Sequence, residues 1–404
     1  MRQPCVLLKY GELALKGRNK ERFERQLVHN LRHALSDAGF PVRIRRRRGA
    51  LILSAAEYSD EPRQQARTQR EFLVRARELI GISVVQPALR VDRTPEAASS
   101  AAVDLARTLR PDGTAATFAV RARRRNKDFP LTSTQLADRV GARIQAELGW
   151  PVDLSEPQVE VAVEVDRAEI LVCVERHRGQ GGLPVGSSGR ALVLMSGGFD
   201  SPVAAYRAMR RGLACDFVHF TGAPLTGPAS AYKAYALTRR LARFQGEAGV
   251  LWLVPLGQAQ RALATAGAGG LQVVAQRRLM VRTADRLARR GGAQALVTGD
   301  SLGQVSSQTL ANLATVEEAA TLPVLRPLLA WDKEEILTEA ARLGTAEISR
   351  LPDEDCCALL VPPSVATRST PGQLARLESR LDVNELVGEL VEKARPLRPD
   401  PSGG

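Results

Sequence analysis

The feature that most constrains the fold is an apolar segment that runs directly into a glycine-rich turn and then into a helix. Residues 191–195 (ALVLM) have the composition of a buried strand, residues 196–201 (SGGFDS) form the turn, and Pro202 suits the first position of a helix. Two adjacent glycines let backbone N–H groups point into the turn, and serine hydroxyls and the helix dipole add to their attraction for an anion. The segment therefore predicts a phosphate-binding loop between a strand and a helix.

The same alternation of strand and helix continues through the C-terminal half of the chain. Short apolar segments alternate there with helical segments, at residues 191–195, 215–220, 250–255, 295–299 and 324–326. This pattern is typical of a doubly wound parallel sheet. The turn is not a Walker A loop, because no Gly-Lys-Ser or Gly-Lys-Thr follows at the required spacing. A helical tail is expected over 372–395, and a disordered end over 396–404, which is rich in Pro and Gly.

A glycine-rich segment at residues 177–189 (HRGQGGLPVGSSG) marks a domain boundary. Before it, hydrophobic spacing predicts a mixed α/β region with no tandem repeat. The strands expected there are 4–9, 42–48, 50–53, 84–91, 114–124 and a hairpin of 159–165 with 169–175 that turns near Asp166 and Arg167. The helices expected there are 19–38, 65–80, 95–109 and 132–148.

Positive charge is concentrated in the first part of the chain. The net charge is +13, and residues 1–150, with 29 Arg or Lys and 16 Asp or Glu, carry all of it. This clustering favours a polyanionic partner, and nucleic acid above all. The candidate phosphate-contacting residues lie in two runs: Arg45, Arg46, Arg47, Arg48, Arg121, Arg123, Arg124, Arg125 and Lys127. Successive residues of a strand face opposite ways, so not all of them can touch one ligand. The alternative is a solvated basic surface without a ligand.

Composition excludes several classes of protein. Apolar residues make up 44% and charged residues 25%, which is typical of a globular chain. No stretch approaches the roughly 18 apolar residues of a membrane helix, and the N-terminus has neither a secretory signal nor a transit peptide. Five cysteines are too few for a disulfide scaffold. We therefore expect a cytoplasmic protein without a membrane partner.

The cysteines fall into two groups. Cys5 and Cys173 lie in predicted strands and are expected in the core, whereas Cys215 begins another predicted strand and is not assigned to the core. Cys356 and Cys357 lie in an acidic, proline-flanked segment (LPDEDCCALLVPP). The neighbouring acids should raise a thiol pKa there. No second cysteine pair completes a tetrahedral zinc site.

Several motifs together resemble a known enzyme family. The turn SGGFDS resembles the loop of the PP-loop ATP pyrophosphatases. Four other segments and the glycine-rich linker resemble tRNA 4-thiouridine synthetases (the ThiI family) in the family's order, from about residue 5 to residue 365. These segments are KYGELALKG at 9–17, TGDSLGQVSSQ at 298–308, RPLLAWDKEE at 326–335 and LPDEDCC at 351–357.

The resemblance implies an architecture and a reaction. It implies a ferredoxin-like domain at 1–61, an RNA-binding THUMP domain at 62–178, a linker at 179–189, a PP-loop catalytic domain at 190–395 and the tail at 396–404. It also implies ATP-dependent transfer of sulfur to the uridine at position eight of tRNA, through an adenylated uridine and a cysteine persulfide. Some members carry a C-terminal rhodanese domain, and we expect none here.

The resemblance also implies the nucleotide contacts, which it places at Leu194, Met195, Ser196, Gly197, Gly198, Asp200, Ser201, His219, Phe220, Arg277, Gly299 and Gln308. An aromatic residue such as Phe220 at a strand end could instead belong to the core. Asp200 and Asp300 are the candidate catalytic carboxylates, and Asp200 is the candidate ligand of Mg²⁺. Either carboxylate could instead cap a helix. The segment 221–230 departs from the family's pattern, which leaves its contacts open.

Sulfur handling is assigned by the resemblance to the segment that contains Cys356 and Cys357, with Cys356 preferred. Cys215 is the spare candidate for the thiol that closes a disulfide after transfer, because a ring between adjacent cysteines is strained. The implied partners are tRNA and a cysteine desulfurase as sulfur donor. A homodimer and a role in thiamine synthesis stay open. The alternatives are another PP-loop tRNA thiolase that modifies C2, or a tRNA-binding protein with a vestigial nucleotide site. Amidation by ammonia is disfavoured by the RNA-binding half.

Overall fold

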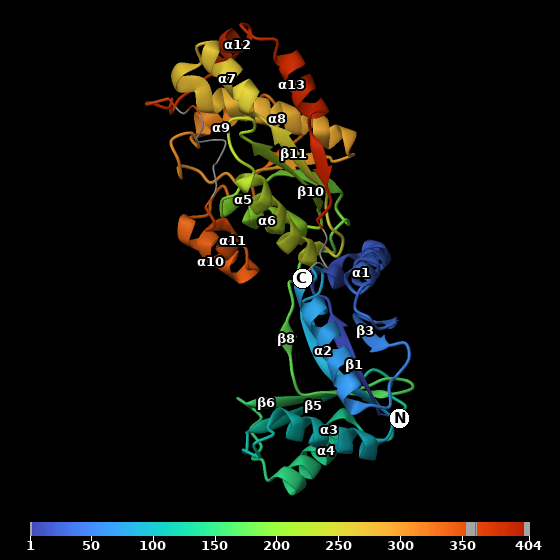
Figure 1. Cartoon of the computed structure of the whole chain (residues 1–404). Helices are drawn as coiled ribbons and strands as arrows, with labels where there is room; N and C mark the ends of the chain where they lie inside the picture. The colour runs from blue at the N-terminus through green and yellow to red at the C-terminus, as the bar shows by residue number, and fades with distance from the viewer. Residues whose placement is uncertain (1, 353–359, 361, 400–404) are drawn as a thin grey trace. The chain divides into compact units, whose positions relative to one another are not determined.

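The computed structural model describes residues 2–352, 360 and 362–399. It contains two compact units, Met1–Gly182 and Leu183–Gly404, which are drawn in Figure 1. No helix in the described part of the chain is both long and apolar enough to cross a membrane.

One sheet runs through the N-terminal unit, in the strand order β2-β3-β1-β4-β7-β6-β5. Its first half consists of β1 (Arg2–Lys9), β2 (Val42–Arg47), β3 (Ala50–Ala55) and β4 (Val84–Val91), together with α1 (Lys20–Ala34) and α2 (Pro62–Glu78). The tight connection from β2 to β3 is possible because Gly49 adopts a φ of 78°, a conformation that glycine tolerates best. The strands expected at both sides of Gly49 are therefore confirmed.

The second half of this sheet consists of β5 (Phe118–Arg124), β6 (Val159–Val165) and β7 (Ile170–Cys173), and the short β8 (His177–Arg178) pairs with β4. The helices α3 (Pro95–Leu109) and α4 (Ser133–Leu148) pack together beside it. β6 and β7 pair antiparallel, which confirms the predicted hairpin. Because one sheet joins both halves, the predicted domain boundary between residues 61 and 62 stays a prediction.

The C-terminal unit has a second sheet, in the order β13-β12-β9-β10-β11-β14. Its strands are β9 (Arg190–Leu194), β10 (Ala214–Thr221), β11 (Leu251–Pro255), β12 (Ala295–Val297), β13 (Val324–Leu325) and β14 (Arg395–Leu397). All neighbours run parallel except β14, which pairs antiparallel with β11. The chain builds outward from β9 to β11 and then returns to the other side of β9. The strand order therefore reverses between β9 and β12, where ligands bind in doubly wound sheets.

Helices cover both faces of this sheet (Figure 1). On one side α5 (Asp200–Arg210) contacts α6 (Ala229–Gln245) and α10 (Lys333–Leu343), and α11 (Ala346–Ser349) adjoins them. On the other side α8 (Gln272–Arg290) contacts α7 (Gly257–Thr265), α9 (Leu310–Glu317) and α13 (Val383–Glu392). Leu192, Val218, Phe220 and Val254 are among the buried residues that pack with α8 in a hydrophobic core cluster of this unit.

The C-terminal part differs from the sequence-based expectation. Instead of one helical tail over 372–395, there are two helices, α12 (Pro371–Glu378) and α13, because Asp382 starts a new helix by accepting a hydrogen bond from the Glu385 N–H at 2.9 Å. Pro396 and Leu397, expected in a disordered tail, lie in β14, where they pair with residues of β11. Pairing with the edge strand β11 supplies the backbone hydrogen bonds that a disordered tail would lack.

Candidate functional site

The glycine-rich turn after β9 is closed by its own serines. The Ser201 hydroxyl accepts a hydrogen bond from the backbone N–H of Ser196 at 2.9 Å, and the two serine hydroxyls lie 3.0 Å apart. The Gly198 N–H donates to the Ser196 hydroxyl at 3.3 Å. The turn therefore ends at the N-terminus of α5 in a defined conformation, as an anion-binding loop requires.

Asp200 is the first residue of α5, and its carboxylate is engaged by two side chains from distant segments. Lys333 donates from Nζ to Oδ1 at 2.8 Å, and Gln304 donates from Nε2 to Oδ2 at 2.9 Å. No side chain caps α5. The alternative in which Asp200 serves as a helix cap is therefore wrong.

Asp300 lies in the loop after β12 and is the acidic centre of the site. Its carboxylate accepts hydrogen bonds from Arg277, from Thr298 at 2.8 Å, and from Arg326 and Gln308 at 3.4 Å each. Burial raises the pKa of this carboxyl, but the charges of Arg277 and Arg326 and the Thr298 hydrogen bond outweigh burial, so the pKa is lowered. Asp300 caps no helix either, since Thr309 caps α9. The residue is held as a carboxylate between two guanidinium groups.

The two loops touch at the point where the strand order reverses. A Cβ atom on Gly299 would lie 2.7 Å from the backbone nitrogen of Ser201 and 2.9 Å from the carbonyl carbon of Asp200. Only glycine allows this approach without a shift of one loop. The loop after β12 is thus packed directly on the start of α5.

The other predicted nucleotide contacts lie near the ends of the same central strands. His219 in β10 donates from Nδ1 to the Met195 carbonyl oxygen at 2.8 Å, which links β10 to the residue after β9. Leu194 is partly buried, and Met195 is buried. The Phe220 side chain belongs to the hydrophobic core cluster. Its position in β10 is the observation that would support a contact with the nucleotide. Gly197 lies in the turn itself, between Ser196 and Gly198.

Sequence reasoning missed three residues of this site. Lys333 and Gln304 contact Asp200, and Arg326 contacts Asp300. Each lies inside one of the motifs that carry the family resemblance, 298–308 or 326–335. Their presence in a motif was a signal, but their partners are more than twenty residues away and could not be read from spacing.

The described cysteines are unsuited to nucleophilic chemistry. Cys5, Cys173 and Cys215 are all buried and free of disulfides. Burial raises the pKa of the Cys5 thiol to about 12, and it raises the pKa of Cys173 and Cys215 as well. This argues against Cys215 as the spare thiol that would close a disulfide after transfer. Cys356 and Cys357 lie outside the described residues.

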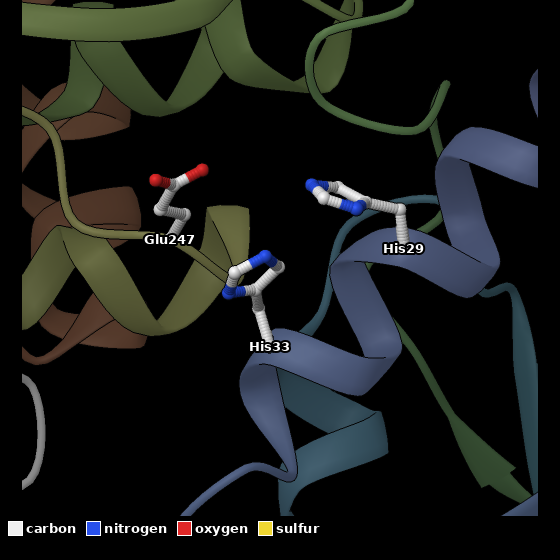
Figure 2. Close-up of side chains that lie close together, drawn as sticks. All are labelled: His29, His33 and Glu247. Carbon is white, nitrogen blue, oxygen red and sulfur yellow. The ribbon is translucent and has the colours of Figure 1, made fainter.

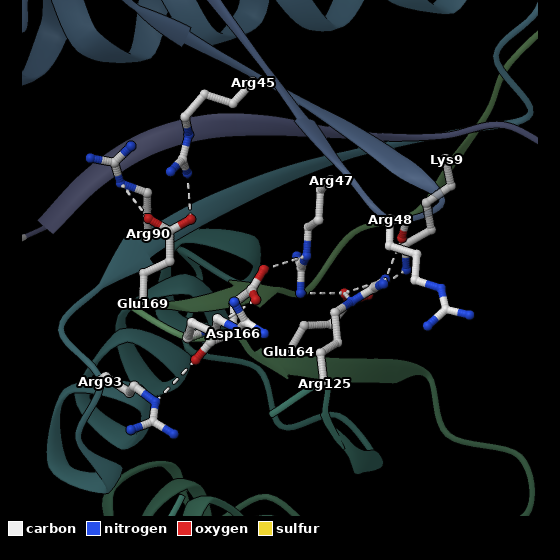
Figure 3. Close-up of polar contacts among 11 residues, drawn as sticks. Lys9, Arg45, Arg47, Arg48, Arg90, Arg93, Arg125, Glu164, Asp166 and Glu169 are labelled. Atoms are coloured by element: carbon white, nitrogen blue, oxygen red, sulfur yellow. Dashed lines mark hydrogen bonds and ion pairs between the residues drawn. The ribbon is translucent and has the colours of Figure 1, made fainter. Parts of the chain in front are cut away.

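The two basic runs of the N-terminal unit are divided between surface and interior (Figure 3). Arg46, Arg48, Arg121, Arg123 and Lys127 are exposed. Of the two runs, Figure 3 shows Arg45, Arg47, Arg48 and Arg125. Arg45 pairs with Glu169, Arg124 donates to the Phe129 carbonyl oxygen, and Arg125 pairs with Glu164.

The structure corrects the prediction that Arg47 contacts RNA. Its side chain is 6% exposed and forms ion pairs with Glu164 at 3.1 Å and Asp166 at 2.8 Å. A phosphate would have to displace both carboxylates to reach it. Arg47 therefore belongs to the interior of the unit, as the alternation along β2 requires.

Two histidines of α1 lie one helical turn apart (Figure 2). The ring centroids of His29 and His33 are 4.6 Å apart, and both side chains are exposed. A tetrahedral zinc site needs three or four protein ligands. Within the described part of the N-terminal unit, no third His, Cys, Asp or Glu completes such a group. We therefore assign no metal to this pair.

Comparison with known families covers most of the chain. The family described as "Thiamine biosynthesis protein (ThiI)" matches residues 186–383, the ThiI ferredoxin-like domain matches 5–70, and the THUMP domain matches 95–175. The expected fold is thereby confirmed: a ferredoxin-like domain and a THUMP domain, followed by a PP-loop domain with a doubly wound, largely parallel sheet.

Individual proteins agree with this match. A protein of Nocardia farcinica named "Probable tRNA sulfurtransferase" is 60% identical, with 98% of this chain and 94% of the relative covered. A Thermus thermophilus protein of the same name is 42% identical, with 98% and 96% covered. A crystal structure of a 4-thiouridine synthetase in complex with RNA and bound ATP matches with a TM-score of 0.89 at 29% identity, over 98% of this chain and all of that one. On these grounds the chain belongs to the ThiI family.

Proposed function

We propose that this protein is an ATP-dependent tRNA sulfurtransferase that converts the uridine at position eight to 4-thiouridine. The observation that supports it most is the junction of the SGGFDS turn with the Asp300 loop at the strand-order reversal, in a chain that also carries a THUMP domain. The first feature suits binding of a nucleoside triphosphate, and the second suits binding of RNA. The names of the relatives agree with this assignment.

ATP would be held by residues of the C-terminal unit. The N–H group of Gly197 and the start of α5 would face the phosphates, while the N–H groups of Ser196 and Gly198 hold the turn closed through the serine hydroxyls. Three cationic side chains are held near this turn by their contacts with the two candidate carboxylates. Arg277 and Arg326 contact Asp300, and Lys333 contacts Asp200. When bound, ATP supplies the adenylate group that turns the uridine oxygen O4 into a leaving group. Positive charge fixed in advance would stabilise the phosphate charge that develops in this step.

Magnesium fits one of the two candidate carboxylates better than the other. Both oxygens of Asp300 already accept hydrogen bonds, and two of these bonds come from guanidinium groups. A metal ion would have to replace these donors, so Asp300 is a poor metal ligand. Asp200 is less buried, with a side chain 21% exposed, and its donors are the side chains of Lys333 on Oδ1 and Gln304 on Oδ2, which a metal ion would have to displace. We therefore propose Asp200 as the residue that would hold Mg²⁺, with Lys333 moving to a phosphate.

The sulfur step uses the two cysteines outside the described residues. We propose that a cysteine desulfurase transfers sulfur to Cys356 as a persulfide. The terminal sulfur of the persulfide then forms a bond to C4 of the uridine, and AMP leaves with the former O4. The Cys357 thiolate attacks the Cys356 sulfur, which forms a disulfide and releases the thiolated base. Supply of sulfur for thiamine thiazole synthesis would start from the same persulfide.

The test is the product. Purified protein is incubated with unmodified tRNA, ATP, Mg²⁺, cysteine and a cysteine desulfurase, and the tRNA nucleosides are separated and identified by mass. We expect 4-thiouridine at position eight, with one AMP formed for each sulfur transferred. Appearance of 2-thiouridine instead would replace this proposal with the other thiolase reaction. Binding of tRNA without AMP formation would indicate a vestigial nucleotide site.

A further inference from the structure

Glu164 in β6 is a buried carboxylate surrounded by three basic side chains (Figure 3). Its side chain is 7% exposed, and it lies 2.7 Å from Lys9 Nζ, 3.1 Å from Arg47 Nη2 and 3.3 Å from Arg125 Nη2. Burial raises the pKa of Glu164, but the hydrogen bond and charge of Lys9 and the charges of both arginines outweigh burial and lower the pKa. Glu164 is therefore ionised at neutral pH.

The three basic residues come from three separate segments of the chain. Lys9 ends β1, Arg47 ends β2, and Arg125 follows β5. Arg125 also donates from Nη1 to the Arg48 carbonyl oxygen at 2.7 Å, and its backbone N–H donates to the Val165 carbonyl oxygen at 2.9 Å. The turn between β2 and β3 is thus held beside the end of β5. Arg48 and Lys127, on the two sides of this contact, have exposed side chains.

The charges in this group do not balance. Three cationic side chains form ion pairs with the single carboxylate of Glu164. Asp166 forms an ion pair with one of the three, Arg47. If this group served only to stabilise the contact between two parts of the sheet, the excess positive charge would add little stability. Apolar residues of similar volume commonly stabilise a fold as well as a buried ion pair does. The side chains of Lys9 and Arg125 also stay partly accessible, at 35% and 19% exposure. The excess positive charge is therefore within reach of an anion.

We propose that Glu164 is a positioning residue for RNA: it holds Lys9, Arg125 and the turn at Arg48 side by side, so that they bind one phosphate of the RNA backbone together. This inference rests on the proposed function, because tRNA is taken as the polyanion. It adds Lys9 to the RNA-contacting residues. It gives Arg47 a supporting role, since Arg47 pairs with the same carboxylate from the buried side.

The proposal predicts an effect opposite in sign to simple electrostatics. Removal of a negative charge from a basic surface should strengthen RNA binding, or leave it unchanged where salt screens the charge. If Glu164 positions the cations, Glu164→Gln instead weakens binding of tRNA to the full-length protein about threefold to tenfold, and it reduces the slope of log K against log salt by about one. Glu164→Asp keeps the charge and restores part of the affinity.

Glu160→Gln is the matched control. Glu160 lies in the same strand, is exposed, and lies 3.9 Å from Arg121. Its replacement removes the same charge without disturbing the group, so tRNA affinity should stay unchanged or rise slightly. Affinity of Glu164→Gln equal to or tighter than that of the wild type, as for Glu160→Gln, overturns the proposal.

A second set of variants covers the case in which thermal unfolding shows that Glu164→Gln does not fold. Arg125→Gln and Lys9→Gln should each reduce the salt slope by about one. In a folded Glu164→Gln background, Arg125→Gln should add little further loss, because the two residues act as one unit. Unchanged slopes in both single variants contradict the inference. A wild-type protein whose tRNA binding shows no salt dependence would contradict the proposed function instead, so the two failures are distinguishable.

Discussion

Lys333 lies at the start of α10 and donates to the carboxylate of Asp200, the first residue of α5, across 2.8 Å. The same ammonium group lies 5.5 Å from the centre of the Phe199 ring. This contact ties two helix N-termini together beside the phosphate-binding turn. The positive charge of Lys333 is therefore held next to the place where we expect the phosphates of ATP.

Replacement of Lys333 by alanine should remove a cation from the phosphate site without affecting RNA binding. We expect tRNA-dependent formation of AMP to fall about 100-fold, the usual size of effect when one electrostatic stabiliser is lost. The Kd for tRNA should stay within about twofold of the wild-type value. Lys393→Ala is the control, since Lys393 is an exposed lysine that pairs with Glu389 in α13. A loss of AMP formation of the same size in both variants would remove the special role of Lys333.

Replacement of Asp300 by asparagine should destabilise the protein, because it leaves Arg277 and Arg326 without their shared carboxylate. We expect the free energy of unfolding to fall by about 3 kcal/mol at pH 7. The folded-state pKa of Asp300 is lowered, so its contribution is present above the unfolded-state pKa and is lost as the pH falls through the folded-state pKa. The difference between wild type and Asp300→Asn in urea unfolding should therefore shrink below about pH 4. A difference that stays constant between pH 7 and pH 3 would contradict this account.

Gly299→Ala should disturb the phosphate-binding turn, since the new methyl group would meet the backbone of Asp200 and Ser201. Overpacking of this kind costs about 1 to 3 kcal/mol. Equilibrium ATP binding, followed by calorimetry, should weaken at least about tenfold, because the turn itself must shift. Gly372→Ala is the matched control: nothing lies within 4 Å of its added Cβ, and its ATP affinity should equal that of the wild type.

Arg46 and Arg47 are neighbours in β2 and should show opposite phenotypes. Arg46 is exposed, so Arg46→Gln should weaken tRNA binding about threefold without changing the thermal midpoint. Arg47 pairs with two buried or partly buried carboxylates, so Arg47→Gln should lower the free energy of unfolding by about 2 to 4 kcal/mol. Filter binding and thermal unfolding of both variants separate the two roles. Equal thermal midpoints for the two variants would mean that Arg47 is not a structural residue.

Cys356→Ser, or the double change with Cys357, should block 4-thiouridine formation with a cysteine desulfurase as donor. Formation of AMP should persist, because ATP chemistry belongs to the SGGFDS turn and not to the cysteines. Inorganic sulfide should partly restore 4-thiouridine, since it can attack the adenylated base without a carrier. Cys215→Ala is the control and should keep full transfer, because its thiol is buried with a raised pKa. Full desulfurase-dependent activity in the double variant would assign sulfur transfer to the donor itself.

The local elements and the order of the domains were predictable because their causes are local. The strand before the SGGFDS turn, the turn and the helix after it follow from apolar runs and glycines that are adjacent in the sequence. The hairpin of β6 and β7 follows from alternation within fifteen residues. The excess of positive charge in the first 150 residues follows directly from the number of charged residues in the sequence.

Contacts between distant residues depended on the tertiary structure. The sequence shows a run of arginines at 45–48, but only the register of β2 and the position of β6 place Arg47 inside against Glu164 and leave Arg46 outside. The residues next to Asp200 in the sequence do not indicate that it contacts Lys333. The two side chains meet because α5 and α10 pack together. The physical reason is that strand period and turn chemistry act over a few residues, whereas sheet order and helix packing decide which charges meet.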